Sequence, residues 1–386
     1  MLSRRILPEI EQLSTPFYLY DMELLRRTLM EIVDCSSAYG YKVCYAIKAN
    51  FEDRIVREVI NAGLGIDAVS GNEVRKGIEL GSDPQKIVYA GVGKSDAEIR
   101  YSIREGIFAF NCESREELYV INSIAGEMGR VVNVALRINP DVEAMTHKHI
   151  STGQADSKFG ISYKEIEEVS DELGELKNIM VTGLHFHIGS QLQHIQVFEH
   201  LCHRVNSMYQ WFTTRGFNLT HLNLGGGLAI DYDEPDIRPM ADIKVYFGLF
   251  HKHLNVPKEI GIYFELGRSV VGQCGELITR VLFNKVNAAG RNIAVIDASM
   301  SQLLRPVLYG AKHAVELLTP HGETKKIYTI AGTACESTDI LVRDVELPEL
   351  RRGDLLTIKS AGAYGTSMAS RYNLQDLPAS RYSDEL

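Results

Sequence analysis

The sequence contains no CxxC pair, and this absence excludes the two scaffolds that clustered cysteines usually build. Its six cysteines are scattered along 386 residues, and they are Cys35, Cys44, Cys112, Cys202, Cys274 and Cys335. This spacing indicates neither a disulfide framework nor a structural zinc site. Dispersed cysteines are typical of a reducing compartment, so we expect a cytoplasmic protein.

Long hydrophobic runs are also missing. No stretch approaches eighteen consecutive apolar residues, and residues 1–16 include basic side chains but no apolar region as long as that of an export signal. We therefore expect no membrane span and no export by that route.

Positive charge is not in excess either. The chain has 41 Lys and Arg against 50 Asp and Glu, a net charge of −9, which disfavours binding to nucleic acid or to an anionic membrane. Apolar residues at 45% and charged residues at 24% are ordinary for a globular chain, so disorder, collagen and coiled coils are disfavoured. The expected partners are a small molecule or another subunit.

Short β-branched runs alternate with longer helical patterns, which is typical of βα units around a parallel sheet. We expect strands at 43–47, 65–69, 86–90, 107–110, 131–138, 180–187, 221–224 and 261–265. Helices are expected at 52–62, 72–80, 95–104, 114–128, 163–173, 194–212 and 241–254. This pattern predicts an α/β fold, a TIM-like (β/α)8 barrel.

The pattern changes after Gly267. Residues 270–284, 292–296, 326–330 and 355–359 read as strands without long helices between them, which predicts a C-terminal β-rich domain. Residues 17–20 are too early to belong to the barrel and are expected to join this second sheet. We therefore predict a barrel domain at 24–268 and a sandwich-like or barrel-like β domain made of 1–23 and 269–386.

Active-site groups of such barrels follow the strands at their C-terminal ends. Lys48 follows the first predicted strand, where a lysine is equally well a salt-bridged wall residue or a nucleophile. Desolvation there would lower its pKa and favour Schiff-base chemistry. Arg137, His187 and Glu265 lie at the ends of three other predicted strands.

A glycine-rich turn at 225–227 follows the strand predicted at 221–224. Bare backbone lets several N–H groups approach an anion, and barrel phosphate sites are often built by the loops after the last two strands. Arg268 follows the final strand and could complete such a cradle.

Together these groups meet the needs of pyridoxal 5′-phosphate. Lys48 would bind the cofactor aldehyde, Glu265 would keep the pyridine nitrogen protonated, and His187 would stack on the ring. As isolated residues, these side chains are equally typical of paired or solvated positions.

A metal site is a second interpretation of the histidines. His185 and His187 share one face of a strand, because side chains alternate along it. A metal-dependent hydrolase would need further ligands, which His147 and His149 could supply. No carboxylate-rich motif accompanies them, so we expect no metal there, and a core histidine is the simpler interpretation of His185.

The predicted β domain adds further candidates. Cys335 beside Glu336 offers a proton donor next to an acceptor for an ammonium group. Because this pair is far from Lys48 in sequence, either the chain folds back or a second subunit supplies it. Arg305 offers a guanidinium suited to a carboxylate, and an ordinary surface salt bridge is the alternative.

Seven motifs in register over nearly the whole chain resemble those of the diaminopimelate decarboxylases, a family of fold-type III pyridoxal phosphate enzymes. They are YAIKAN at 45–50, HFHIGSQ at 185–191, GGG at 225–227, ELGR at 265–268, RPVLYG at 305–310, CESTD at 335–339 and AGAYG at 361–365. The CES and RPxLY motifs separate this branch from the alanine racemases.

The resemblance implies pyridoxal phosphate-dependent decarboxylation of meso-2,6-diaminoheptanedioate to L-lysine and CO2, the last step of lysine biosynthesis. It implies Lys48 and Cys335 as catalytic residues. The implied cofactor-binding residues are Lys48, Asp67, Arg137, His187, Ser190, Gly225, Gly226, Gly227, Glu265, Gly267, Arg268 and Tyr364, and the implied substrate-binding residues are Arg268, Arg305, Tyr309, Glu336 and Tyr364. Cys335 resembles a proton donor that a neighbouring subunit supplies, which implies a homodimer with shared active sites.

Some positions depart from the family pattern. Leu266 stands where the family commonly has proline, Ser299 stands where a glycine is usual, and the tail after Tyr364 lacks the usual Arg-Pro-rich ending. Two alternatives stay open: a decarboxylase of ornithine, arginine or carboxynorspermidine, and an inactive regulatory homologue. A simple diamine precursor would leave Arg305 facing no carboxylate, and the presence of Lys48 and Cys335 argues against an inactive protein.

Overall fold

The computed structural model describes residues 2–140, 158–162 and 164–386. The chain divides into two compact units, a β-rich unit of residues 1–28, 230–241 and 268–386 and a barrel unit of residues 29–229 and 242–267. Residues 230–241 fall inside the range expected for the barrel domain, yet they group with the β-rich unit. Lys359, for example, forms an ion pair there with Asp236.

The barrel unit is built on eight parallel strands that close on themselves. The strands are β2 (Lys42–Ala46), β3 (Gly65–Ala68), β4 (Ile87–Tyr89), β5 (Ala109–Cys112), β6 (Val132–Arg137), β7 (Ile179–His185), β8 (His221–Asn223) and β9 (Gly261–Leu266). The barrel closes where β9 pairs with β2, with Val43 opposite Phe264. The predicted (β/α)8 barrel is therefore confirmed, and its strands lie close to their expected ranges.

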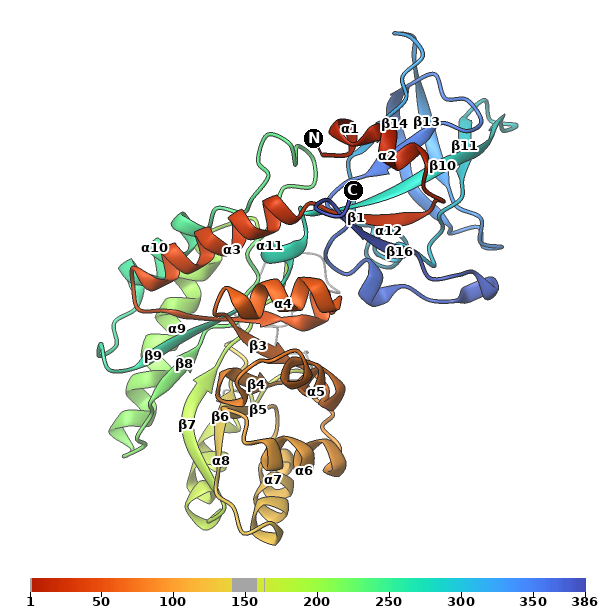
Figure 1. The fold of residues 1–386 in the computed structure, drawn as a ribbon. Helices are drawn as coiled ribbons and strands as arrows, with labels where there is room; N and C mark the ends of the chain where they lie inside the picture. Colours follow the sequence, from red (N-terminus) through yellow and green to blue (C-terminus); the bar gives the residue numbers. More distant parts are fainter. Residues whose placement is uncertain (1, 141–157, 163) are drawn as a thin grey trace. The chain divides into compact units, whose positions relative to one another are not determined.

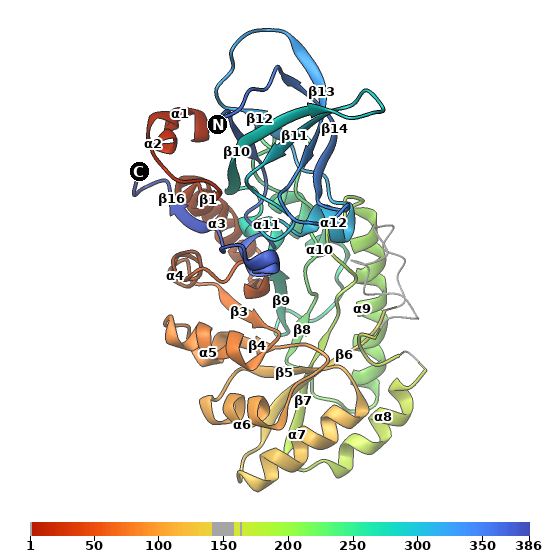
Figure 2. The same ribbon diagram turned by 90° about the vertical axis from the view of Figure 1, so that its right-hand side faces the viewer.

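Helices alternate with the barrel strands along the chain and cover the outside of the barrel (Figures 1 and 2). They are α3 (Met22–Ser37), α4 (Asp53–Asn61), α5 (Gly71–Glu79), α6 (Asp96–Glu105), α7 (Arg115–Glu127), α8 (Ile166–Glu172), α9 (Gln196–Thr214) and α10 (Ile243–His253), with 3-10 turns η1 (Ile47–Ala49), η2 (Pro84–Lys86) and η4 (Leu173–Glu175). Tyr163, the first residue of one expected helix, lies outside the described residues.

Local sequence explains where these helices begin and end. At α6, Ser95 and Glu98 form a reciprocal capping box, and the helix stops at Gly106, whose left-handed φ of 70° favours glycine. The helix buries Ile99 and Ile103 on one face, at the spacing of a single helical turn. Its polar face remains toward solvent.

The β-rich unit contains the second sheet (Figure 2). Its strands are β1 (Phe17–Tyr20), β10 (Gly275–Val286), β11 (Asn292–Ile296), β12 (Val315–Leu317), β13 (Lys325–Ala331), β14 (Ile340–Pro348), β15 (Leu355–Ile358) and β16 (Ala379–Tyr382), paired in the order β12-β15-β10-β11-β13-β14. Strand β1 pairs antiparallel with β10 and parallel with β16. The expectation that residues 17–20 join the C-terminal sheet is confirmed.

One expected strand begins later than predicted. Residues 268–271 form the short helix α11 (Arg268–Val271), and β10 starts only at Gly275. All four helical residues are buried, and a short, fully buried apolar run does not distinguish a helix from a strand by its periodicity. The remaining short elements of this unit are α1 (Leu2–Arg5), α2 (Leu7–Glu11), α12 (Arg305–Tyr309), η5 (Thr366–Met368) and η6 (Tyr372–Leu374).

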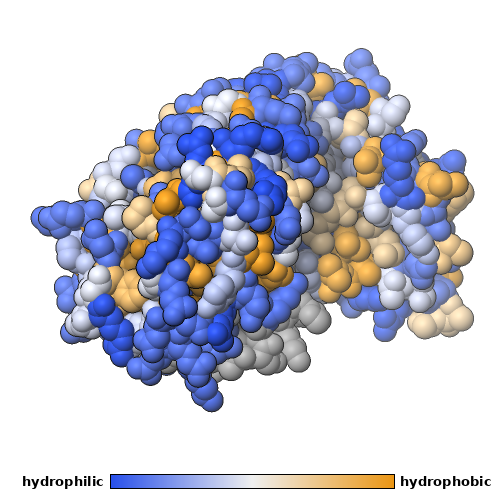
Figure 3. Space-filling view, turned by 90° about the horizontal axis from the view of Figure 1, so that it is seen from below, coloured by the Kyte–Doolittle hydropathy of each residue, from blue (hydrophilic) through white to orange (hydrophobic). Residues whose placement is uncertain are grey.

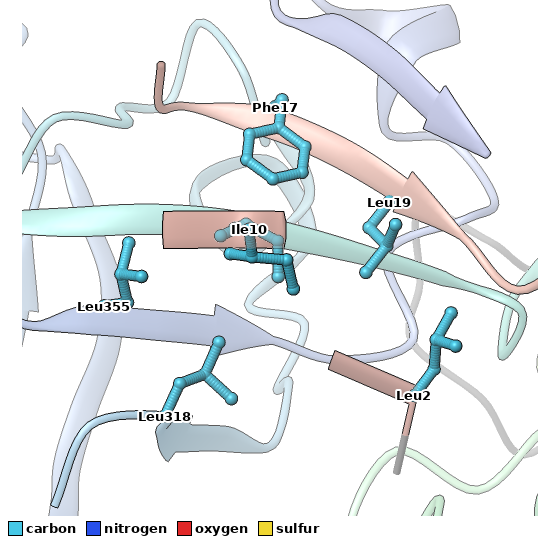
Figure 4. Packing of buried hydrophobic residues seen from close by; sticks show 7 residues of the cluster. Leu2, Ile10, Phe17, Leu19, Leu318 and Leu355 are labelled. Carbon is cyan, nitrogen blue, oxygen red and sulfur yellow. The ribbon is translucent and has the colours of Figure 1, made fainter. Parts of the chain in front are cut away.

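A hydrophobic cluster ties the N-terminal segment to this sheet (Figure 4). Phe17 and Leu19 of β1 pack with Ile278 of β10 and Leu355 of β15, and Ile10 of α2 covers them. Phe17 and Ile10 are completely buried. Burial of such side chains provides the main stabilisation of the packed sheet.

The outer surface is mostly polar on the face drawn in Figure 3, where hydrophobic residues form small groups between hydrophilic ones. Within the described ranges, no helix combines the length and the apolar character needed to cross a membrane.

We predict that Phe17→Ala lowers the free energy of unfolding by about 3–5 kcal/mol, because it removes a fully buried ring and leaves a cavity. Urea denaturation followed by circular dichroism measures this change. Ile327→Ala on β13 is the control, since this side chain is 59% exposed. Equal effects of the two substitutions would contradict the assigned core.

Candidate functional site

Polar side chains meet inside the barrel at the C-terminal ends of its strands. They come from six strands and are Asp67 on β3, Asn111 on β5, Arg137 on β6, His185 on β7, Asn223 on β8 and Glu265 on β9, and all are buried. Burying polar groups is unfavourable unless they are hydrogen-bonded, so such a layer indicates a site rather than a packing solution. We call these six residues the polar layer.

Glu265 is the centre of the polar layer. Its Oε1 accepts hydrogen bonds from Nδ2 of Asn223 at 2.7 Å and from Nδ2 of Asn111 at 3.1 Å, and its Oε2 lies 3.1 Å from Nε2 of His185. Burial alone would raise the pKa of Glu265, but attraction to His185 and Lys48 outweighs burial and lowers it. The carboxylate is therefore ionised at neutral pH. His185 acts as a partner of Glu265, in line with the simpler interpretation of this histidine.

Lys48 lies in the 3-10 turn η1, directly after β2. Its Nζ is 2.8 Å from Oδ2 of Asp67, whose side chain is completely buried. Burial, reinforced by the charge of Glu265, raises the pKa of Asp67 despite the nearby ammonium. Oδ1 of Asp67 has no hydrogen-bond partner within the described ranges. The Asp67 carboxyl group therefore holds a proton more strongly than an ordinary carboxyl group does.

His187 follows β7 and contacts the glycine turn. The backbone N–H of Gly226 donates to Nδ1 of His187 at 3.2 Å, so the ring proton resides on Nε2. Burial, together with the charges of Arg137 and Lys48, lowers the pKa of His187 to about 3. The imidazole is therefore a neutral, flat ring at physiological pH.

The glycine turn requires bare backbone. A Cβ on Gly226 would lie 1.9 Å from the carbonyl oxygen of Glu265, and one on Gly225 would lie 2.6 Å from Nδ1 of His187. Gly225 and Gly227 both have positive φ, at 66° and 104°. The turn thus packs directly against His187 and Glu265, and its lack of side chains leaves its backbone open to close approach.

Gly267 and Ser190 complete the expected cofactor residues of the barrel unit. A Cβ on Gly267 would be 3.0 Å from Cβ of Ala46 and 3.1 Å from Cβ of Ala49, so this glycine lets the end of β9 approach the turn that carries Lys48. Ser190 is half-buried in the loop after β7.

Arg137 is engaged by a residue that the motifs did not indicate. Its Nη1 is 2.5 Å from Oε1 of Glu113, and its guanidinium lies 4.7 Å from the centre of the Phe159 ring. The second oxygen of Glu113 accepts from the backbone N–H of Gly160 at 2.9 Å. Glu113 therefore fixes the orientation of Arg137.

The β-rich unit holds a second group of chemically important side chains, which we call the arginine cluster: Arg268, Arg305, Tyr232, His313 and Tyr364. Nη1 of Arg268 donates to the hydroxyl of Tyr232 at 2.7 Å, and its guanidinium lies 4.9 Å from the centre of the Tyr364 ring. The guanidinium of Arg305 lies 4.8 Å from the centre of the Tyr232 ring.

Arg305 is the most informative member of the arginine cluster. It is 4% exposed and, within the described ranges, forms no ion pair with a carboxylate, and its Nε has no hydrogen-bond partner there. Nη1 of Arg305 donates to Nε2 of His313 at 2.9 Å, and Nδ1–H of His313 donates to the carbonyl of Lys359 at 2.8 Å. A surface salt bridge is thereby excluded for Arg305 within these residues. A buried guanidinium without a counter-charge is suited to an incoming anion.

Tyr309 ends helix α12, which begins at Arg305. It is half-buried and interacts electrostatically with both Arg268 and Arg305. The RPVLY motif therefore brings its arginine and its tyrosine to the same group of charges.

Cys335 and Glu336 lie on an exposed segment of the β-rich unit. The backbone N–H of Cys335 donates to Oδ1 of Asn373 at 3.0 Å, and the hydroxyl of Tyr372 donates to Glu336. Asp339 anchors the segment, because its two oxygens accept from the backbone N–H groups of Ala334 and Met300 at 2.7 Å each. The thiol is free and exposed, so it is accessible to a neighbouring molecule.

Sequence reasoning missed several residues that organise these groups. Asn111, Asn223 and Glu113 are not in the seven motifs, although each lies at or just after the end of a barrel strand, which was the available signal. His313 could be found only from the structure, since nothing near it in sequence marks a role. The metal interpretation receives no support from His185, which hydrogen-bonds to Glu265, and His147 and His149 lie outside the described residues.

The barrel unit suits the cofactor expected from the sequence. An ionised carboxylate, a lysine, a neutral imidazole and a turn of bare backbone are the groups that pyridoxal phosphate requires for its ring nitrogen, aldehyde, ring face and phosphate. The unfilled hydrogen-bonding capacity of Asp67 and the bare backbone at Gly226 are structural observations that favour this fit.

Comparison with known proteins agrees with this chemistry. A family model described as the pyridoxal-binding domain of pyridoxal-dependent decarboxylases matches residues 26–272. The diaminopimelate decarboxylase of Bacteroides thetaiotaomicron is 45% identical over 375 residues, which cover 97% of this chain and 97% of that protein. The diaminopimelate decarboxylase of Aquifex aeolicus is 37% identical over 370 residues, covering 94% of this chain and 84% of that protein.

Solved structures that resemble this chain include diaminopimelate decarboxylases as well. Diaminopimelate decarboxylase from Helicobacter pylori, complexed with L-lysine, superposes with a TM-score of 0.91 at 34% identity, covering 97% of this chain and 93% of that one. The enzyme of the same name from M. jannaschii, in co-complex with L-lysine, has a TM-score of 0.88 at 32% identity, covering 97% and 88%.

We predict that His187 and His221 contribute a fall in the free energy of unfolding as the pH drops below about 6.5, because they stay neutral in the fold while the unfolded chain takes up protons. Asp67, whose pKa is raised in the fold, contributes in the opposite direction. The pKa of His187 is lowered to about 3 and that of His221 to about 4, so both contribute between their folded and unfolded values. Each can contribute up to about 1.4 kcal/mol per pH unit.

Urea titrations at about pH 7, 6 and 5 test this dependence. His187→Gln should make the free energy of unfolding less dependent on pH, because the contribution of His187 is removed. His200→Gln, at an exposed position on α9, should leave the slope unchanged. A slope that is identical in all three proteins would contradict the assigned neutral state of His187.

Proposed function

Because the chain belongs to the pyridoxal-dependent decarboxylases, whose cofactor is pyridoxal 5′-phosphate, we propose that it converts meso-2,6-diaminoheptanedioate into L-lysine and CO2. It is then a carboxy-lyase that completes lysine biosynthesis. The relatives at 45% and 37% identity are diaminopimelate decarboxylases, and two structural neighbours hold L-lysine, the product of this reaction. The observation that carries the choice of substrate is Arg305, a buried cation without a carboxylate partner within the described ranges.

The barrel unit supplies the groups that hold the cofactor. The amino group of Lys48 would hold the aldehyde, and Asp67, 2.8 Å away, would accept or return the proton of that amine. Glu265, kept ionised by Asn111, Asn223 and His185, retains a proton on the pyridine nitrogen. When bound, pyridoxal phosphate supplies the electron sink that stabilises the carbanion left by departing CO2.

The remaining cofactor contacts follow from the same assignments. Neutral His187, whose Nδ1 accepts from the N–H of Gly226, would lie against the ring of the cofactor. The bare backbone of Gly225, Gly226 and Gly227, with Ser190, would let the phosphate approach closely, while the N–H groups of Gly225 and Gly226 donate to Asn223 and His187 within the fold. Gly267 permits close packing beside Lys48. Arg137, Arg268 and Tyr364 are also proposed to contact the cofactor. Glu113 fixes the orientation of Arg137.

The arginine cluster binds the distal end of the substrate. Arg305 and Arg268 pair with the distal carboxylate, and Tyr309 and Tyr364 hydrogen-bond nearby. His313 keeps Arg305 oriented. The carbonyl of Lys359 accepts from Nδ1–H of His313, so Nε2 of His313 is free to accept from Arg305. Ornithine lacks a second carboxylate and would leave this charge unpaired, which is unfavourable in a buried place.

Cys335 and Glu336 act on a substrate held by a second subunit. Glu336 accepts the distal ammonium, and the Cys335 thiol protonates the α-carbon after CO2 has left. The exposed position of this thiol supports the assignment. The functional molecule is then a homodimer with shared active sites. All six cysteines are free thiols, which supports a cytoplasmic location.

We predict that the purified protein is yellow, that borohydride bleaches it, and that mass spectrometry then places the reduced adduct on Lys48. It should release L-lysine from the meso substrate at least about 100-fold faster than it decarboxylates ornithine, since the Arg305 charge would otherwise lose its partner. Lys42→Ala, at the other end of β2, is the control that keeps the adduct, whereas Lys48→Ala loses it. An adduct on another lysine would overturn the proposal.

We predict that Cys335→Ala keeps the cofactor absorbance but lowers kcat by about 10²- to 10⁴-fold, the usual contribution of a positioned proton donor. Absorbance spectra and steady-state assays with the meso substrate measure the two properties. Cys35→Ala, at a half-buried position on α3, should change neither. Loss of the cofactor band in Cys335→Ala would contradict the assigned role.

A further inference from the structure

A cluster of metal-ligating side chains lies on the outside of the barrel, where helices α9 and α10 pack against each other. Glu199 and His203 are one turn apart on α9, and His253 is the last residue of α10. One ligand atom from each of the three side chains can be chosen so that all of them lie within 4.8 Å of one another. None of the three has a part in the proposed reaction.

The contacts within this cluster are close but incomplete. Nδ1 of His253 is 3.4 Å from Oε1 of Glu199, and the rings of His203 and His253 have their centres 6.4 Å apart with planes inclined at 76°. Two imidazoles and one carboxylate thus point toward a common volume. His203 is exposed, so water and ions reach this volume.

The backbone at the end of α10 is held by Asn206, which lies three residues after His203 on α9. Nδ2 of Asn206 on α9 donates to the carbonyl of His253 at 2.9 Å, and Oδ1 of Asn206 accepts from the backbone N–H of Asn255 at 2.9 Å. The end of α10 is thereby held against α9.

We propose that Glu199, His203 and His253 form a binding site for a divalent transition-metal ion of the zinc class. Two imidazoles and a carboxylate are a ligand set that Zn²⁺ accepts in tetrahedral geometry, with water in the fourth position. Imidazole also suits Cu²⁺ and Ni²⁺, whereas Mg²⁺ and Ca²⁺ prefer oxygen ligands and are not expected to bind.

Closing the site requires only small rotations of the side chains. Ligand atoms bound to zinc at about 2.0–2.2 Å are roughly 3.3–3.6 Å apart in a tetrahedron, and the observed limit of 4.8 Å is slightly wider. The bound ion would link α9 to α10 across their interface. It therefore stabilises the outer wall of the barrel and takes no part in decarboxylation.

Equilibrium dialysis of the chelator-treated holoenzyme against Zn²⁺, together with thermal unfolding followed by circular dichroism, tests this site. We expect binding of Zn²⁺ to raise the melting temperature by several degrees, and Mg²⁺ to have no effect. His203→Ala should bind Zn²⁺ at least tenfold more weakly and lose the thermal shift. The matched control is His200→Ala, an exposed histidine on the same helix, which should behave as the parent protein does.

Substitution by cobalt gives an independent readout. Co²⁺ in a tetrahedral site of nitrogen and oxygen ligands absorbs visible light, and this band should be present in the parent protein and absent in His253→Ala and Glu199→Gln. Circular dichroism in the absence of metal shows whether each variant is folded. Zinc affinity and thermal shift that are the same in His203→Ala, Glu199→Gln and the parent would overturn the proposal.

Discussion

The buried carboxylate of Glu265 is the interaction on which the barrel interior depends. A charge inside a protein is tolerated only when donors surround it, and here Asn111, Asn223 and His185 donate from three different strands. These donors keep the carboxylate ionised at neutral pH. They also fix its place beside the glycine turn, where Gly226 leaves no room for a side chain against the backbone of Glu265.

That charge, together with burial, shifts the pKa values of other titratable groups in the barrel. Asp67 lies next to Lys48, and the negative charge of Glu265 helps to raise its pKa. His187 is pushed toward the neutral form by burial and by two nearby cations. One site therefore contains an ionised acid, an acid that holds its proton more strongly than usual, and a neutral base, which is the arrangement that proton traffic around a cofactor needs.

The sequence predicted the barrel well because its strands are apolar runs separated by helical periodicity. Lys48, His187 and Glu265 could be proposed as site residues because they stand at strand ends. The supporting residues could not be found in this way: Asn111 and Glu113 carry no motif, and the orientation of Arg305 by His313 depends on a contact between side chains that no periodicity encodes. The strand expected from residue 270 was wrong over its first residues, since α11 is buried on all sides and its pattern resembles that of a strand.

The order in which the strands occur along the chain has a consequence for biosynthesis of the protein. Glu265 lies on β9, the last strand of the barrel, and β9 also closes it by pairing with β2. A growing chain on the ribosome has therefore already made Asn111, His185 and Asn223 before it makes Glu265, the acceptor of their hydrogen bonds. The polar layer around Glu265 is therefore complete only after translation has passed residue 265.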